Sequence, residues 1–444
     1  MRIKGGRIMR NDRMGRWVLA GVAAAAMAIS VSAAAAPMAK PEDVGLSSAR
    51  LERVSELMQR EIDAGTFSGA VTLVARHGRV VHLKAQGLMD IASKKPMQTD
   101  AVFRIMSMTK PIVAVSILMM VEEGKVRLND PVGRFIPELQ NLPVAAANAA
   151  GSVAADRPIT IRDLLTHTSG LMSGGASSKQ NSVVAVRPGE GYTQVLQRLK
   201  EVPLDFQPGM RWAYSPQYAF DTLVHVVEIV SGKPFDEFAK ERIFDPLGMK
   251  NTFFYSAKKR SDVATLYRHN DKGVLEPQPD PGFMNGKYFS GGGGLSSTAE
   301  DYLQFASMLL GGGRLGNTRL LSRRTVDLMT SVFVPASTPG RSPGEAFGLG
   351  VRVVTDSAAR ETLVSPGTFG WSGAFNTHFF VDPREDLVAI FMTQVSGLGL
   401  RFQVRNDFET AVMQALVDDA PASPRLTSES APADAVAQAG AASR

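Results

Sequence analysis

A serine and a lysine three residues apart, Ser107 and Lys110, stand at the start of a long apolar segment. On the first turns of a helix this spacing places the hydroxyl and the amine on one face, one turn apart. A serine hydroxyl is a poor nucleophile at neutral pH and needs an adjacent base, which a lysine provides when burial or nearby positive charge lowers its pKa. The pair therefore predicts nucleophilic catalysis, although the same spacing also fits a serine that only caps a helix.

Two later segments carry residues that suit the same chemistry. Tyr214 follows a turn at 207–209 and precedes a predicted helix. Such a tyrosine is often a half-buried packing residue, but its phenol can also move a proton between a serine and a leaving group. Residues 371–374 read Trp-Ser-Gly-Ala before a strand-like run. Gly373 marks a strand start or bulge, or lets the backbone approach a substrate and offer an N–H group to an oxyanion.

Other chemical signals are weaker. His167 lies at a predicted helix end and is interpreted as a structural hydrogen-bonding residue. The G-x-S-x-G string at 340–344 lacks the strand and helix that a nucleophile elbow requires, so it is predicted to be a flexible loop. The tetraglycine at 291–294 is not followed by the lysine of a phosphate-binding loop. The six histidines lack metal-ligand spacing, so we expect no metal and no cofactor.

The first 36 residues have the layout of a secretory signal peptide. A basic stretch over 1–16 precedes an apolar run over 17–31, and small residues follow. The run is short and rich in alanine for a membrane-spanning helix, which needs about 20 apolar residues. We expect cleavage near Ala35, no stable membrane anchor, and a mature chain that is exported to the periplasm or secreted.

The charge and the amino-acid composition limit the classes of binding partner that we expect. The formal net charge is +6, but the leader holds six basic residues against one acidic residue, which leaves the mature chain at +1. No basic patch with interleaved aromatics remains, so we expect no nucleic-acid partner. The absence of cysteine excludes disulfides, thiolate metal sites and a cysteine nucleophile. Residues 418–444 are rich in Ala, Pro and Ser and are predicted to be a disordered tail. The oligomeric state is left open.

Between the ends the hydrophobic periodicity changes along the chain. An amphipathic helix is predicted over 47–65, and an antiparallel hairpin over 70–76 and 80–86. Helical patterns dominate from 106 to about 245. Later segments are predicted as the strands 348–355, 377–382 and 387–393 and the helix 405–417.

This order favours an α/β lobe interrupted by an inserted lobe. The α/β lobe is expected over about 42–105 and 285–417, and an all-helical lobe over about 106–284. Together they form one domain over 37–417. A site is expected between the two lobes.

These motifs, in this order, resemble the serine β-lactamase and penicillin-binding protein superfamily. Within it the chain is most similar to class C β-lactamases and family VIII carboxylesterases, over about residues 42–417. The shared segments, besides those around Tyr214 and Trp371, are 103–111, 122–132, 163–171, 207–209 and 291–297. The resemblance implies a β-lactamase/transpeptidase-like fold of the α/β (α+β) class, with an antiparallel sheet flanked by helices and an inserted helical lobe.

The resemblance also implies roles for individual residues. Ser107 is then the nucleophile that becomes acylated, Lys110 activates it, and Tyr214 is the general base and acid. The backbone N–H groups of Ser107 and Ala374 form the oxyanion hole. The implied oxyanion and substrate-binding group comprises Ala374, Trp371, Ser372 and Gly373.

Two departures from class C β-lactamases bear on the substrate. Their tyrosine-x-asparagine motif has Pro216 at its third position here, and their lysine-threonine-glycine motif has Trp371 in place of the lysine. An indole removes a charge partner for an anionic substrate and supplies an apolar wall, as in the family VIII esterases. Both departures favour hydrolysis of uncharged carboxylic esters.

Other functions stay open. A class C-like β-lactamase or a peptidase acting on D-amino-acid peptides would use the same residues. An acyltransferase would do so when an alcohol or amine replaces water. A non-catalytic, stably acylated binding or sensor protein is a further alternative. The expected partner is a small-molecule ester, amide or β-lactam.

Overall fold

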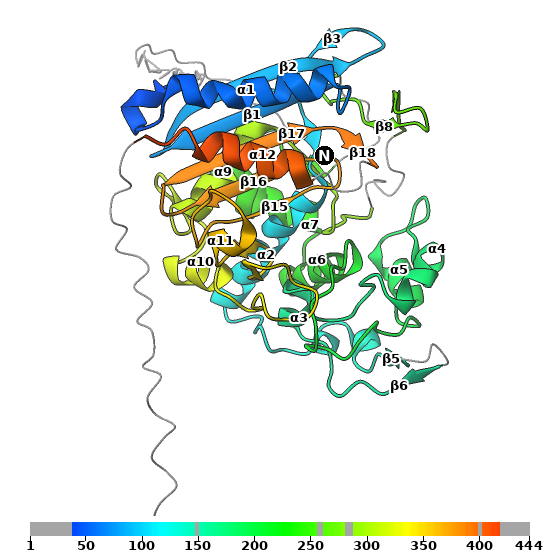
Figure 1. Cartoon of the computed structure of the whole chain (residues 1–444). Helices are drawn as coiled ribbons and strands as arrows, with labels where there is room; N and C mark the ends of the chain where they lie inside the picture. Colours follow the sequence, from blue (N-terminus) through cyan, green and yellow to red (C-terminus); the bar gives the residue numbers. More distant parts are fainter. Residues whose placement is uncertain (1–37, 147–150, 255–260, 280–286, 398–401, 418–444) are drawn as a thin grey trace, which may run out of the picture. The chain divides into compact units, whose positions relative to one another are not determined.

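The computed structural model describes residues 38–146, 151–254, 261–279, 287–397 and 402–417 (Figure 1). The predicted signal peptide and the predicted C-terminal tail lie outside these residues and remain predictions. Within the described residues, no helix is both long enough and apolar enough to cross a membrane.

An eight-stranded sheet with antiparallel neighbours forms the centre of the described chain. Its early strands form the predicted hairpin, and its late strands come from the C-terminal part of the sequence. In spatial order the strands are β13 (Glu345–Phe347), β14 (Arg352–Val354), β15 (Phe369–Ser372), β16 (His378–Asp382), β17 (Leu387–Thr393), β1 (Gly69–Arg76), β2 (Arg79–Asp90) and β3 (Lys95–Pro96). β1 and β17 are buried along their whole lengths, because helices cover both faces of the sheet.

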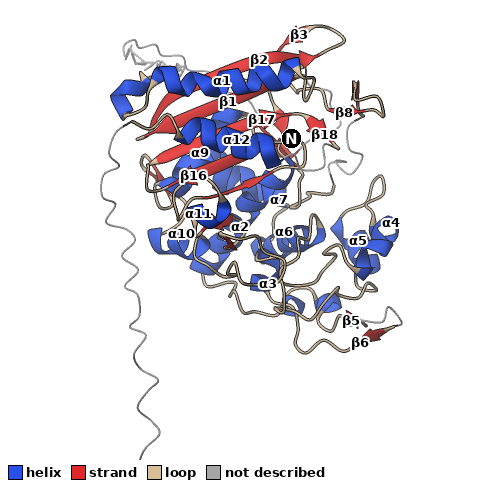
Figure 2. Ribbon diagram, in the orientation of Figure 1, coloured by secondary structure: helices blue, strands red, loops and turns tan. Residues whose placement is uncertain are grey.

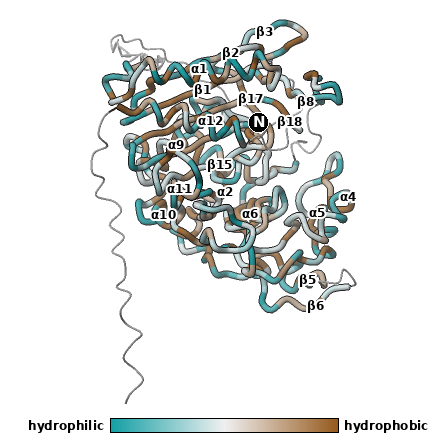
Figure 3. Tube along the Cα trace, viewed as in Figure 1, coloured by the Kyte–Doolittle hydropathy of each residue, from teal (hydrophilic) through white to brown (hydrophobic). Residues whose placement is uncertain are grey.

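The two faces of the sheet carry different helices (Figure 2). α1 (Ser48–Asp63) and α12 (Phe402–Met413) pack on one face, where Leu57 and Phe408 join Phe391 of β17 in a buried cluster. α2 (Thr109–Glu122) and α9 (Ala299–Leu310) belong to the larger cluster on the other face. Figure 3 shows the same division: apolar residues concentrate on the central strands, whereas α1 alternates between apolar and polar positions.

The segment between the two parts of the sheet is mainly helical, but it differs from the all-helical lobe predicted over about 106–284, because short strands lie among its helices. Its helices after α2 are α3 (Ile161–Leu165), α4 (Asn181–Val184), α5 (Tyr192–Leu199), α6 (Tyr218–Ser231), α7 (Phe235–Ala239) and α8 (Asp245–Leu247). Its short strands are β5 (Val144–Ala145), β6 (Ser152–Val153), β7 (Phe253–Phe254), β8 (Tyr267–His269) and β9 (Leu275–Pro277).

The remaining α-helices and strands lie outside that segment. They are β4 (Phe103–Arg104), β10 (Leu295–Ser297), β11 (Arg314–Leu315), β12 (Thr318–Arg319), β18 (Val395–Ser396), α10 (Arg323–Met329) and α11 (Ser357–Arg360).

One predicted strand is shorter than expected. Of residues 348–355, only Arg352–Val354 form a strand. Gly350 has φ 78°, a left-handed conformation that interrupts an extended chain. The approach of this turn to α2 also requires glycine, because an added Cβ would lie 2.7 Å from Cβ of Ala114.

His82 on β2 makes the stability of the fold depend on pH. The side chain is buried against Thr72, with Nε2 2.8 Å from Oγ1. Burial, and to a lesser degree Lys84, lowers the pKa of His82 to about 4 from 6.5. The unfolded state therefore binds this proton more tightly, so folding stability falls as the pH drops from about 6.5 to about 4, by up to about 3 kcal/mol.

We expect His82→Gln to flatten the loss of stability across that pH window. The measurement is urea unfolding at several pH values between 7 and 4. His77→Asn, on the exposed turn of the same hairpin, is the matched control. An unchanged slope in His82→Gln would contradict the assignment.

Candidate active site

Ser107 lies in a tight turn that leads directly into α2. The turn spans Met106–Met108 and the helix begins at Thr109. Met106 has φ 48°, a left-handed backbone that non-glycine residues adopt rarely and that often marks a functional site. Tyr302 of α9 holds the turn by donating a hydrogen bond to the carbonyl oxygen of Met108 at 2.8 Å. The nucleophile predicted from the sequence therefore stands at a helix start fixed from a second element.

Lys110 is fully buried, and its Nζ atom meets three oxygen atoms. Nζ lies 3.2 Å from Oγ of Ser107, 2.6 Å from the carbonyl oxygen of Pro216 and 2.7 Å from the carbonyl oxygen of Gly292. The first contact is the one that the spacing predicts. The two carbonyls come from distant loops and have no counterpart in the sequence prediction.

Tyr214 contacts the same oxygen atom of Ser107. Its hydroxyl lies 2.8 Å from Oγ of Ser107, and its ring centroid lies 5.0 Å from Nζ of Lys110. The tyrosine is half-buried in the loop before α6. The structure thus brings the three predicted catalytic side chains together around one oxygen atom.

The tetraglycine at 291–294 passes close to this group. A Cβ atom on Gly291 would lie 2.4 Å from the carbonyl oxygen of Phe220, and one on Gly292 would lie 2.6 Å from Cα of Gln217. Only glycine allows the loop to press this closely against the start of α6. The loop therefore carries the carbonyl oxygen of Gly292 to Lys110.

The segment 371–374, here called the third motif, meets, through the backbone, the turn that carries Ser107. Oγ1 of Thr377 donates to the carbonyl oxygen of Ile105 at 3.0 Å, and a Cβ atom on Gly373 would lie 2.3 Å from the same oxygen. Within the described part of the chain, the N–H groups of Ser107 and Ala374 have no acceptor. Two such donors on adjoining segments have the chemistry of an oxyanion hole.

Trp371 belongs to an aromatic wall beside the tyrosine. Its ring centroid lies 5.5 Å from that of Tyr214 and 5.2 Å from that of Phe347. His167 lies behind the tyrosine, with ring centroids 4.7 Å apart, and its Nδ1 accepts a hydrogen bond from the backbone N–H of Ser215. Burial, then the charge of Lys110, holds the pKa of His167 well below 6.5, so the imidazole is neutral. These contacts agree with the structural role predicted for His167.

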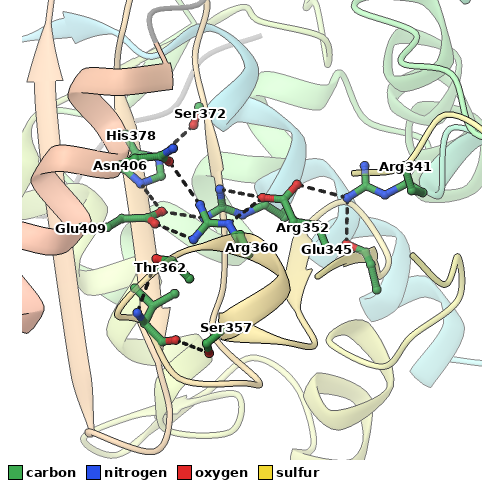
Figure 4. Close-up of polar contacts among 12 residues, drawn as sticks. Arg341, Glu345, Arg352, Ser357, Arg360, Thr362, Ser372, His378, Asn406 and Glu409 are labelled. Carbon is green, nitrogen blue, oxygen red and sulfur yellow. Dashed lines mark hydrogen bonds and ion pairs between the residues drawn. The ribbon is translucent and has the colours of Figure 1, made fainter. Parts of the chain in front are cut away.

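The side chain of Ser372 lies on the face of β15 opposite to that of Trp371. Its Oγ lies 2.8 Å from Nδ1 of His378 on β16, and Nε2 of His378 lies 3.1 Å from Glu409 on α12 (Figure 4). Successive side chains of a strand point to opposite faces. Trp371 therefore faces the aromatic wall, whereas the hydroxyl of Ser372 is bonded toward α12 and is not part of the group around Ser107.

The chain Ser372–His378–Glu409 has the residue types of a catalytic triad but not its electrostatics. Glu409 also pairs with Arg352 and Arg360, both at 2.7 Å (Figure 4). Burial raises the pKa of Glu409, but these partners offset it and hold the pKa well below 4.5. Burial lowers the pKa of His378 to about 4, which makes it a weak base at neutral pH. The contacts among Ser372, His378 and Glu409 hold α12 against the sheet.

Comparisons with known proteins identify the family of this chain. The Beta-lactamase family model matches residues 53–414. The chain belongs to the beta-lactamase family. This finding confirms the superfamily resemblance and the α/β fold predicted from the sequence.

Relatives of known name lie in the same family. Protein Rv1367c of Mycobacterium tuberculosis is 39% identical over 355 residues, which cover 76% of this chain and 88% of that protein. Esterase EstB of Burkholderia gladioli is 31% identical over 389 residues, covering 82% and 94%. The solved structure of EstCE1, a hydrolase with promiscuous acyltransferase activity, has a TM-score of 0.72 at 30% identity and covers 82% of this chain and 99% of its own. The family and these relatives support hydrolase activity in general.

Several residues of the site escaped the sequence analysis. The carbonyl oxygens of Pro216 and Gly292 act through the backbone, which leaves no side-chain signal. Asp221, a carboxylate in the first turn of a mainly apolar helix, is fully buried beside the tetraglycine. The sequence signal for Asp221 was an acidic residue at a position where the apolar pattern of the helix predicts burial.

The ion cluster behind β15 should be essential for stability. Glu409→Gln leaves Arg352 and Arg360 buried with less compensating charge, so we expect a loss of about 3–5 kcal/mol in the free energy of unfolding. Glu345→Gln is the matched control, because Glu345 pairs with the same two arginines at a partly exposed position. We expect its loss to be less than half as large. Urea unfolding at pH 7 measures both, and equal losses would contradict a special role for Glu409.

Proposed function

We propose that this chain is a serine hydrolase that cleaves uncharged carboxylic esters through an acyl-enzyme on Ser107. The observation that carries the proposal is the convergence of Lys110 and Tyr214 on Oγ of Ser107, at 3.2 and 2.8 Å. A serine with two proton-transfer groups in hydrogen-bond contact has the arrangement that nucleophilic catalysis requires.

The proposed reaction has two steps. Oγ of Ser107 attacks the ester carbonyl carbon while Lys110 and Tyr214 take its proton. The C–O bond to the alcohol then breaks, and the alcohol leaves with a proton delivered through Tyr214. Water attacks the acyl-enzyme next, its proton passes back through the same groups, and the acid leaves with Ser107 restored.

The developing oxyanion would accept hydrogen bonds from the backbone N–H groups of Ser107 and Ala374. Ala374 is exposed, whereas Gly373 beside it is buried against Ile105. A substrate oxygen can therefore reach this donor from the solvent side. Removing one donor from such a pair typically lowers kcat about 100- to 1,000-fold.

The surroundings of Ser107 favour a neutral substrate. Trp371 stands where class C β-lactamases have a lysine, and its indole packs on Tyr214 instead of presenting a charge. The relative EstB is named an esterase, which agrees with this assignment. A β-lactamase or a D-amino-acid peptidase remains the alternative within the same chemistry.

Transfer to an alcohol is a second candidate. EstCE1, whose structure covers most of this chain, is described as a hydrolase with promiscuous acyltransferase activity. An alcohol that replaces water in the second step would use the same proton path. We further propose export to the periplasm or the exterior, on the basis of the leader sequence.

Hydrolysis of p-nitrophenyl butyrate by the mature protein tests the main proposal. We expect turnover that falls at least 1,000-fold in Ser107→Ala, because that variant lacks the nucleophile. Release of p-nitrophenol followed at 405 nm is the measurement, with equal thermal unfolding midpoints as the control for folding. Activity retained in Ser107→Ala would identify another nucleophile. Turnover of nitrocefin or D-alanyl peptides without ester turnover would favour the alternative.

Trp371 should determine the charge preference of the substrate. Trp371→Lys supplies an ammonium group at the edge of the site, so we expect the ratio of kcat/KM for nitrocefin to kcat/KM for p-nitrophenyl butyrate to rise about 10-fold or more. Trp371→Phe keeps an apolar wall and is the matched control, with a ratio near that of the wild type. A ratio that does not differ between the two variants would refute the assignment.

A further inference from the structure

Lys110 is held by uncharged groups alone. Among the described residues no carboxylate forms an ion pair with its amine, and its contacts are one hydroxyl and two backbone carbonyls. The carbonyl oxygens of Pro216 and Gly292 accept two hydrogen bonds from Nζ, and the remaining contact of the amine is with Oγ of Ser107. The positions of the two carbonyls therefore decide how the amine is oriented toward Ser107.

Asp221 fixes one of these two carbonyls. Its Oδ1 accepts hydrogen bonds from the backbone N–H of Gly292 at 2.9 Å and from Oγ of Ser290 at 2.8 Å, and its Oδ2 accepts one from the hydroxyl of Tyr288. Gly292 thus donates its N–H to Asp221 and offers its carbonyl to Lys110. Asp221 and Lys110 thus form hydrogen bonds with the same residue, Gly292, one with its N–H group and one with its carbonyl oxygen.

Asp221 is buried, and these hydrogen bonds hold its carboxylate in position. The side chain is 1% exposed, and no arginine or lysine pairs with it in the described part of the chain. A buried carboxylate is costly unless hydrogen bonds satisfy it. Burial raises the pKa of Asp221, and the bonds from Tyr288, Gly292 and Ser290 oppose that rise. Its position in the first turn of α6 adds a favourable helix dipole.

We propose that Asp221 is a positioning residue for Lys110, acting through Gly292, so that the amine is aimed at Ser107. This inference rests on the proposed function, because it assumes that Ser107 is the nucleophile. Asp221 touches neither Ser107 nor a substrate. Its effect is expected in the rate of the step in which Ser107 loses its proton and not in substrate binding.

The test uses a fluorophosphonate probe, which reports the nucleophilicity of Ser107 without a known ester. Oγ of Ser107 bonds to phosphorus, fluoride leaves, and the proton passes to the Lys110–Tyr214 pair. The measured quantities are the maximal labelling rate and the probe concentration at half-maximal rate, with the site mapped by mass spectrometry. We expect Asp221→Ala to lower the maximal rate about 10- to 100-fold, as small misplacements of catalytic groups do, with little change in the half-maximal concentration.

Two variants separate positioning from general stability. Asp221→Asn keeps Oδ1 as the acceptor for Gly292 and Ser290, so we expect a rate within about threefold of the wild type. Asp382→Ala is the matched control, because Asp382 is equally buried and accepts only backbone N–H groups at the far end of β16. We expect Asp382→Ala to lower the unfolding midpoint while the labelling rate of the folded protein is unchanged.

A third variant covers the case in which Asp221→Ala does not fold. Gly292→Ala places a Cβ atom 2.6 Å from Cα of Gln217 and 2.9 Å from the carbonyl oxygen of Pro216, which displaces the loop with Asp221 intact. We expect the same loss of labelling rate.

The outcomes distinguish this inference from the proposed function. Labelling of the wild type at Ser107 with equal rates in Asp221→Ala, or in Gly292→Ala, would overturn the positioning role alone. Loss in Asp221→Asn as large as in Asp221→Ala would also overturn it, because the charge and not the hydrogen bond to Gly292 would then matter. Absence of labelling at Ser107 in the wild type would overturn both proposals.

Discussion

The contact on which the site depends is the meeting of one buried amine with three oxygen atoms. Nζ of Lys110 lies 2.6, 2.7 and 3.2 Å from these oxygen atoms. Two of these neighbours are backbone carbonyls, which cannot rotate away as a side chain can. The direction of the third contact, to Ser107, is therefore a property of the fold. Three segments more than 70 residues apart in sequence must meet to within about 3 Å for it to exist.

The fold supplies that accuracy by burying the elements that carry the three segments. α2 is buried over almost its whole length, so Lys110 sits on a helix that cannot tilt without disturbing the core. The start of α6 and the tetraglycine loop are in direct backbone contact, which places the carbonyls of Pro216 and Gly292 relative to each other. The same loop enters β10, which pairs with β4 just before Ser107. Short stretches of backbone therefore link the segments that carry the residues of the site.

This arrangement explains what the sequence could and could not predict. Ser107, Lys110 and Tyr214 were found because their residue types and local spacing carry the signal, and the early hairpin followed from two short β-branched runs joined at His77 and Gly78. The carbonyls of Pro216 and Gly292 were not found, because any residue has a carbonyl and its direction depends on distant packing. The contact of Ser372 with His378 depends on where β15 ends: the strand includes residues 371 and 372, which sends their side chains to opposite faces. α9 was missed although Thr298 caps it and glycines follow it, so the signals for that helix were present.

The charges near the third motif also follow from the packing and bear on the substrate. Arg405 of α12 lies just behind this motif and is 3% exposed, and its guanidinium donates to the carbonyl oxygen of Gly373 and to Oδ1 of Asn376. That cation supports the backbone that carries the N–H group of Ala374, and it is already engaged by acceptors of the protein. Under the proposed function, an anionic substrate would lose hydration against the indole of Trp371, and Arg405 is already engaged by Gly373 and Asn376. A neutral ester has no such cost, since its carbonyl needs only hydrogen-bond donors and its alkyl groups gain from contact with an aromatic wall. Under the proposed function, the packing that fixes the backbone N–H group of Ala374 therefore also disfavours charge in the substrate.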